Sequence, residues 1–203
     1  MKKMILSIAC SFLFSTLVSA QANVSFGIKG GMNIASQTVK VSGVKVTTDP
    51  RIGYHFGGFV TAMFSEKIGL QPELFFNSVG ARGDSFFDGE KASDRFGYIS
   101  VPIMLRYQPI KIFNIHAGPQ LGVLINAKSK LGNTTFDIEQ TKTLDFGAAF
   151  GAGVDLPFGL GFSARYTAGL ASVYDLDEFG AGDIKVRNNV FQISTTYRFG
   201  GSD

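Results

Sequence analysis

The sequence predicts an all-β fold, an eight-stranded antiparallel up-and-down transmembrane β-barrel with four long outer loops and three short periplasmic turns. Three observations lead to this prediction. After residue 20 no apolar run is long enough for a membrane helix, although only 17% of the residues are charged and the chain carries 25 Gly and 20 Phe. Hydrophobicity instead alternates residue by residue in eight stretches of about ten residues. The connections between these stretches are alternately short and long, as in barrels of Gram-negative outer membranes.

The first twenty residues have the pattern of a secretory signal peptide. Lys2 and Lys3 precede the apolar stretch Met4–Val18, and the small-residue site 18–20 follows it. A signal peptidase would cleave after this site, between Ala20 and Gln21. An uncleaved anchor helix is disfavoured because the apolar run is short for a membrane span and polar sequence follows at once. A lipoprotein cut before Cys10 is disfavoured because apolar residues continue past it. We therefore expect a removed segment, 1–20, and one barrel domain, 21–203.

Removal of this segment changes the composition in two ways. The 19 Lys and Arg become 17 against 16 Asp and Glu, a net charge of about +1, so the overall charge is no argument for nucleic-acid binding. The one Cys of the sequence, Cys10, lies in the segment, so the mature chain has no thiol and no disulfide. No motif indicates a cofactor or a metal.

The first four stretches each place apolar and polar side chains on opposite faces. They are Val24–Ile34, Ile52–Phe64, Ile68–Ser78 and Tyr98–Tyr107. In the first stretch Val24 and Ile28 alternate with Ser25 and Lys29. In the third, Gln71, Glu73 and Asn77 share the polar face. We expect the apolar face to point outward to lipid and the polar face to line the lumen.

The last four stretches follow the same rule. They are Phe113–Asn126, Leu144–Leu156, Leu160–Leu170 and Phe191–Phe199. Small residues and glycines share the polar face, which suits a narrow lumen. Pro72, Pro102 and Pro119 lie inside stretches, where proline removes a hydrogen-bond donor, and we expect bulges or local kinks there. The interface girdle would have to be formed by Tyr and Phe, since the chain has no Trp.

The connections set the predicted topology. Three short links, 65–67, 108–111 and 157–159, would be periplasmic turns. Four long polar links would be outer loops, and both termini would then be periplasmic. The strands of a soluble β-sandwich also alternate in hydrophobicity, but that fold does not require connections that are alternately short and long. The long links are 37–51, 81–96, 127–143 and 171–188.

Seven charged residues are predicted to point into the lumen. They are Lys29, Glu73, Arg106, Asp145, Asp155, Arg165 and Arg198. Charges inside a small barrel must pair, because an isolated buried ion is very costly. We expect a charge network that fills the lumen, and a narrow polar conduit or a recognition site remain alternatives. Within it we expect Glu73 to face Arg106, with Lys29 or Arg165 completing the cluster.

Four short motifs resemble the PorT-like family of outer-membrane β-barrels. They are GIKGGMN at Gly27–Asn33, LQPELFF at Leu70–Phe76, YISVPIMLRY at Tyr98–Tyr107 and AGPQLGVL at Ala117–Leu124. The resemblance covers essentially the whole mature chain. It implies an eight-stranded barrel in the outer membrane, in contact with lipid and lipopolysaccharide, and a founding member is associated with protein secretion. The resemblance implies no catalytic residues.

The terminal stretch of such proteins commonly ends in an aromatic residue that the barrel-assembly machinery recognises. Tyr197 and Phe199 fit this signal, although Gly200–Asp203 extend beyond it. For function, we expect a non-enzymatic outer-membrane protein whose surface loops contact a partner, in envelope integrity, adhesion or secretion. A narrow channel for small solutes is the alternative. A lipid-modifying enzyme, with His55 near Ser36 or Ser85 at the outer rim, is a more distant one.

Overall fold

The computed structural model describes residues 23–41, 44–84, 91–132, 134–138, 141–174 and 184–199. All regular structure in these residues is β-strand. The strands are β1 Asn23–Val41, β2 Val44–Thr47, β3 Asp49–Met63, β4 Ile68–Asp84, β5 Lys91–Ile110, β6 Phe113–Leu131, β7 Thr134–Asp137, β8 Leu144–Asp155, β9 Leu160–Gly169 and β10 Lys185–Phe199. The predicted signal peptide, 1–20, lies outside the described residues.

Eight of these strands close into a barrel. They follow the order β1, β3, β4, β5, β6, β8, β9, β10, and each is antiparallel to its neighbours. β10 pairs with β1, from the pair Phe26 and Phe199 to the pair Lys40 and Lys185, and this seam leaves the wall formed by the eight strands without a free edge. The predicted fold class, an eight-stranded antiparallel up-and-down barrel, is confirmed.

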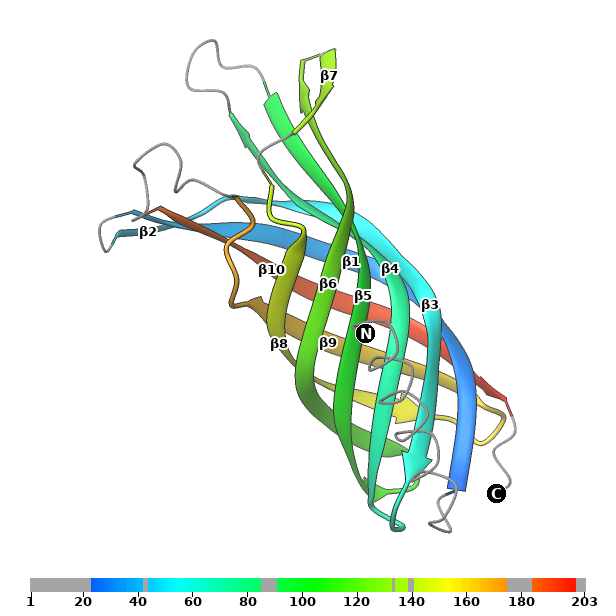
Figure 1. Cartoon of the computed structure of the whole chain (residues 1–203). Coiled ribbons are helices and arrows are strands. Elements are labelled where there is room, and N and C mark those ends of the chain that lie inside the picture. Colours follow the sequence, from blue (N-terminus) through cyan, green and yellow to red (C-terminus); the bar gives the residue numbers. More distant parts are fainter. Residues whose placement is uncertain are drawn as a thin grey trace, which may run out of the picture.

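One end of the barrel carries the tight turns. Phe64–Lys67 joins β3 to β4, Lys111–Ile112 joins β5 to β6, and Leu156–Gly159 joins β8 to β9. Gly159 has a φ of 86°, a left-handed conformation that suits its place in the last of these turns. Asn23 pairs with Met63, so the described start of the chain lies at this same end (Figure 1). We call it the short-turn end.

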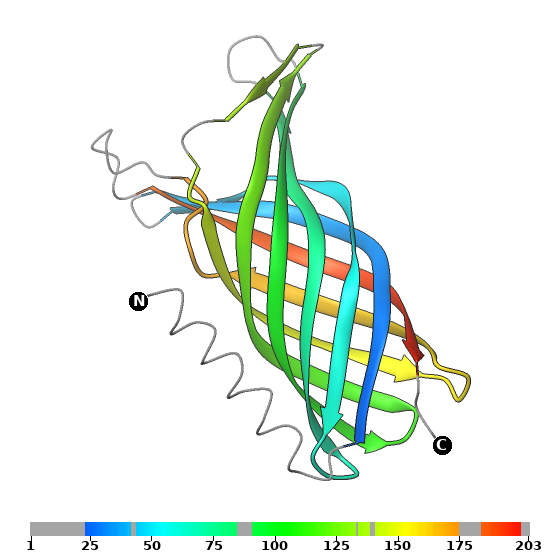
Figure 2. The ribbon, with the colours of Figure 1, turned by 45° about the vertical axis from the view of Figure 1, so that its right-hand side comes forward.

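At the opposite end the strands extend into two arms (Figures 1 and 2). The β2 arm consists of Thr38–Val41 of β1, the whole of β2, and Lys185–Arg187 of β10. The β7 arm consists of the outer ends of β4, β5 and β6 together with β7. Much of the sequence that we expected to form outer loops is therefore hydrogen-bonded strand. β5 alone has 20 residues, twice the expected length, because adjacent hairpin strands continue to satisfy one another's backbone groups beyond the wall.

Bulges, which we expected at Pro72, Pro102 and Pro119 as one alternative to local kinks, are not found at these three prolines. Pairing is interrupted beside Pro72 and Pro102, but the register is the same on both sides of each gap, and it is continuous through Pro119. A proline removes only the hydrogen bond to one neighbouring strand, so the other neighbour can keep the register. The register shifts lie elsewhere, between Pro50 and His55, at Gly97–Tyr98 and between Tyr107 and Ile110.

The two faces of the wall have the predicted chemistry. Outward side chains such as Phe26, Ile52 and Leu74 are exposed by 58–60%, whereas Lys29 and Glu73 on the inner face are exposed by 6% and 3%. An exposed apolar belt of this extent is what a lipid-facing barrel presents. Among the described residues no helix is both long and apolar enough to cross a membrane.

Candidate functional site: the charged lumen

The inner face is crowded because glycines alternate with large side chains. A Cβ atom at Gly27 would clash with the ring of Phe59, which points into the lumen at 6% exposure. A narrow barrel of eight strands has room for such rings and charges only where the facing residues are small. The polar groups of the lumen lie in three layers between the short-turn end and the arms.

The middle layer is centred on Glu73 of β4. Arg165 of β9 binds this carboxylate through two parallel hydrogen bonds, 2.8 Å from Nη1 to Oε2 and 2.6 Å from Nη2 to Oε1. Lys29 Nζ of β1 lies 2.9 Å from Oε2, and Gln71 Nε2 donates to Oε1 at 2.9 Å. The Glu73 side chain is fully enclosed. A paired arginine of this geometry is among the strongest charge-assisted contacts in proteins.

The lower layer is centred on Asp155 of β8. Arg106 of β5 and Arg198 of β10 both form ion pairs with it, the second at 3.1 Å, and Asn114 Nδ2 donates to it at 3.0 Å. The Asp155 side chain is 17% exposed and that of Arg198 is 23% exposed. This layer is thus in partial contact with solvent, unlike the one above it.

The expected direct pair of Glu73 and Arg106 is wrong. Gln71 lies between them, because its Oε1 accepts a hydrogen bond from Arg106 Nη1 at 3.1 Å while its Nε2 donates to Glu73. Arg106 is near the base of its strand, and from there its ion pair is with Asp155. Both Lys29 and Arg165 contact Glu73. Gln71 shares the inner face with Glu73 two residues away, and this spacing was the signal in the sequence that it would act as the bridge.

A second bridge joins the layers through His116. Its Nε2 accepts a hydrogen bond from Arg165 Nε at 3.3 Å, and Nδ1 lies 3.1 Å from Asn114 Oδ1. Because Nε2 accepts, the proton of the neutral imidazole is on Nδ1, where it can be donated to the amide oxygen. Asn114 in turn donates to Asp155. The middle and lower layers therefore form one connected set of hydrogen bonds.

The upper layer is built of neutral groups. Asn33 Oδ1 lies 2.7 Å from His55 Nδ1 and accepts a hydrogen bond from Gln192 Nε2 at 3.0 Å. Asn33 Nδ2 donates to Asn77 Oδ1 at 2.7 Å. Asp145, which we expected in the charge network, stands apart from it. Its contact is a hydrogen bond from Asn188 Nδ2 at 3.1 Å, and among the described residues it forms no ion pair.

His55 also meets Ser194, with 2.8 Å between Nε2 and Oγ. Together with Asn33 this has the donor and acceptor order of a serine–histidine–asparagine triad. His55 and Ser194 are each only 2% exposed and point into the lumen, so a lipid substrate cannot reach the hydroxyl. The partner of His55 is thus Ser194 and not Ser36 at the rim, and Ser85 lies outside the described residues.

An apolar cluster closes the lumen below the arms. It consists of Ala35, Val79, Phe96, Tyr98, Ala127, Val173 and Val190, with Leu124, Ile138 and Tyr174 packed against it. Phe96 is completely buried. Tyr174 donates a hydrogen bond to Asp94 Oδ2 at 3.2 Å, and burial together with this carboxylate raises the pKa of its hydroxyl. We missed this cap in the sequence because most of its side chains lie in or beside the expected loops, where periodic alternation ends.

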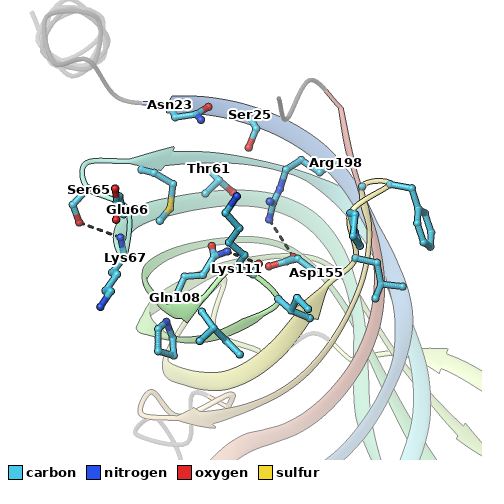
Figure 3. Close-up of a pocket in the computed structure, with 18 of the residues that line it drawn as sticks. Asn23, Ser25, Thr61, Ser65, Glu66, Lys67, Gln108, Lys111, Asp155 and Arg198 are labelled. Carbon is cyan, nitrogen blue, oxygen red and sulfur yellow. Dashed lines mark hydrogen bonds and ion pairs between the residues drawn. The ribbon is translucent and has the colours of Figure 1, made fainter. Parts of the chain in front are cut away.

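The short-turn end is open instead. A cavity of about 1140 Å³ lies between the three turns, and Asp155 and Arg198 form its inner wall (Figure 3). Deeper among the described residues of the lumen lie small pockets, two of them of about 20 Å³ each. Each of these holds roughly one water molecule. In the described part of the chain the lumen is therefore a vestibule that narrows sharply at the charged layers.

Comparison with known proteins agrees with this architecture. Residues 19–175 match the model of a family described as outer membrane protein beta-barrel domain. A comparison with curated proteins found no match. The crystal structure of Neisserial surface protein A is similar at 11% identity and a TM-score of 0.55, over 87% of this chain and 99% of that one. That of Ail, the attachment invasion locus protein of Yersinia pestis, gives 16% identity and a TM-score of 0.49, over 87% and 99%.

Proposed function

The chain belongs to the outer membrane protein β-barrel domain family, and we propose that it is a non-enzymatic integral protein whose two arms contact an envelope or extracellular partner. The task of such a contact would be envelope integrity, adhesion or an accessory step in secretion. The single observation that supports this proposal is the difference between the lumen and the arms. The lumen is filled and capped, whereas the arms present large, hydrogen-bonded and exposed surfaces.

The filled lumen argues against transport as the main role. A solute would have to separate Glu73 from Arg165 and Lys29, and then displace the buried ring of Phe96. Breaking a buried ion pair costs several kcal/mol, typically about 3–5, before any gain from binding the solute. The serine that contacts His55, Ser194, is enclosed, which argues against catalysis by this pair.

The proposed orientation places the short-turn end in the periplasm and the arms outside. It agrees with the usual arrangement of short periplasmic turns. In this proposal residues 1–20 are the removed signal peptide. The assembly machinery would recognise Tyr197 and Phe199 at the end of β10. The ring centroid of Phe199 lies 5.6 Å from that of Phe26 across the seam. The resemblance of four motifs to the PorT-like family, of which a founding member is associated with secretion, is the reason to include secretion among the three tasks.

Orientation can be tested with single cysteines, because the proposed mature chain has none. Val44→Cys lies on the β2 arm and Phe158→Cys in a short turn, and both side chains are 66% exposed. A membrane-impermeant maleimide added to intact cells should label the first and leave the second unlabelled until the cells are opened. Labelling of Phe158→Cys on intact cells would reverse the proposed topology.

A narrow channel is the second candidate, and the vestibule of about 1140 Å³ is the observation that favours it. Planar-bilayer recording separates the two functions. We expect the purified protein to give no stable single-channel steps, whereas Phe96→Ala/Val173→Ala, which thins the cap, should leak more than the parent. Regular, sizeable steps from the unaltered protein would favour the channel. A matched control, Phe150→Ala, changes an outward ring and should leave the recording unaltered.

Partner contact is tested by photo-crosslinking in cells. A crosslinking amino acid at Val46 on the β2 arm or Phe136 on the β7 arm should capture a discrete product. The same group at Ile110, which is exposed at the short-turn end, serves as the control. Equal products from all three positions would argue against the arms as the contact surface.

A further inference from the structure

The β2 arm carries a row of like charges that the fold itself sets in line. Lys40 of β1 lies directly opposite Lys45 of β2 on one side and Lys185 of β10 on the other. Directly opposed residues in antiparallel strands have Cβ atoms only about 5 Å apart, and like charges at such positions destabilise the pairing. Arg187, opposite Thr38, adds a fourth cation on the same face. We call Lys40, Lys45, Lys185 and Arg187 the cationic row.

These four side chains are exposed. Each lies in the exposed class, and among the described residues none of them takes part in an ion pair. The other face of the arm is apolar, with Val39 set between Val46 and Val186. The repulsion within the row is therefore not relieved inside the described part of the protein, and an external anion would relieve it.

Protection of a sheet edge does not account for the row. A lysine on an edge strand such as β2 discourages the addition of further strands, and Lys45 fits that role. Lys40, however, lies on the central strand of the arm, where both neighbours are already paired. The β7 arm shows the contrast, because its Lys128 lies opposite Arg95 on one side but opposite Asp137, a counter-ion, on the other.

The position of the row identifies the class of anion. Its face is the outward face of the barrel, and towards the short-turn end it continues through Ser36 and Asn189 to the apolar side chains Ile34 and Phe191. Lys40 lies roughly 20 Å along the strand from Ile34, which is about 14 Å in height for a strand tilted by about 45°. A lysine side chain can reach back several ångströms toward the membrane surface. One continuous face thus offers apolar contacts for acyl chains and, above them, cations for phosphate.

We propose that the cationic row binds the phosphate groups of a phosphorylated glycolipid whose acyl chains lie on the apolar belt below it. The proposal rests on the outward orientation of the arms given above. An assay in detergent does not depend on that orientation, so failure of binding here and failure of the cysteine-labelling test are distinguishable.

The test measures lipid binding to the purified full-length barrel by native mass spectrometry. The probes are bisphosphorylated lipid A, the same lipid with its phosphates removed, and soluble polyphosphate. We expect the phosphorylated lipid to bind at least tenfold more tightly than the dephosphorylated one. Lys40→Gln/Lys45→Gln should weaken its binding roughly 25-fold, since each cation near an anionic headgroup contributes about a factor of five. Lys128→Gln/Lys130→Gln on the β7 arm is the matched control and should change binding less than threefold.

Several results would overturn the proposal. Equal losses from the two double variants would show a general effect of net charge. Equal binding of the phosphorylated and dephosphorylated lipids would exclude recognition of phosphate, and this comparison needs no variant. Polyphosphate that binds the unaltered protein as tightly as the lipid, and competes with it, would assign the row to soluble polyanions. Heat-modifiable gel mobility establishes that each variant is folded before it is compared.

Discussion

Two carboxylates of the lumen each hold two cations, yet their surroundings differ. Glu73 binds Lys29 and Arg165 in full enclosure, whereas Asp155 binds Arg106 and Arg198 at the wall of an open vestibule. The charge count is the same at both sites, one anion for two cations. The depth of the site therefore determines how much each carboxylate contributes to stability, because solvent can replace a lost partner at Asp155 but not at Glu73.

The comparison also separates rigid from adaptable parts of the lumen. Glu73 has four hydrogen bonds from three residues, and all of its partners are nearly inaccessible. At Asp155 the carboxylate and the side chain of Arg198 are 17% and 23% exposed, so water can take the place of a lost contact there. The middle layer thus fixes the wall strands β1, β4 and β9 relative to one another. The lower layer allows local change near the turns.

The largest expected effect follows from removal of the central carboxylate. Glu73→Ala leaves the ammonium of Lys29 and the guanidinium of Arg165 without a counter-ion in an enclosed site. We expect the free energy of unfolding to fall by about 3–5 kcal/mol. Urea unfolding of the protein folded into lipid vesicles, followed by gel mobility, measures the change.

A double variant distinguishes the ion pair from simple loss of packing. Glu73→Ala/Arg165→Met removes one of the two stranded cations and should recover part of the loss, so that the effects of the two single variants are clearly non-additive. If instead the two losses add, the sites are energetically independent and Glu73 does not act through Arg165.

A smaller effect is expected at the vestibule. Asp155→Asn keeps an acceptor for Arg106 and Arg198 but removes the charge, and water can reach the site. We expect a loss of about 1–2 kcal/mol, between the values typical of exposed and of buried pairs. The same urea titration measures it, and a loss as large as that of Glu73→Ala would show that the vestibule is sealed in the membrane.

Much of the fold was predictable because strand periodicity is local. The side of the wall on which Lys29, Glu73, Arg106 and Arg165 lie depends only on alternation along single strands, and each of them points inward as expected. The positions of the bulges were not predictable in this way. Gly97–Tyr98 shifts the register although no proline is adjacent to either residue.

The identity of the partners within the lumen could not be read from the strands. Glu73 on β4 meets Arg165 on β9, which is not a neighbouring strand but lies across the barrel. Such a contact depends on the stagger between strands when the sheet closes, and stagger is a property of the whole barrel. Reasoning from adjacent strands therefore predicted Arg106 as the partner of Glu73. In the structure the amide of Gln71 lies between these two side chains.

High salt should increase the difference between the stability losses that substitution of the two carboxylates causes. At 1 M ionic strength the screening length falls to about 3 Å, which affects charges in contact with solvent but not enclosed ones. We expect the stability difference between the parent and Asp155→Asn to shrink by about half in 1 M salt, and that for Glu73→Ala to stay the same within error. Parallel shrinkage of both differences would contradict the enclosure of Glu73.

The smallest effect is expected at Arg198, the outermost member of the lower layer. Its side chain is 23% exposed, and its ion pair with Asp155 is at 3.1 Å. Arg198→Gln leaves Asp155 with Arg106 and Asn114, so the carboxylate keeps a cation and a hydrogen-bond donor. We therefore expect a loss below about 1 kcal/mol, as for a surface pair. Arg106→Gln is the matched control, because its side chain is only 5% exposed and also donates to Gln71. It should cost clearly more, and an equal cost for the two arginines would mean that depth in the lumen does not govern the strength of these pairs.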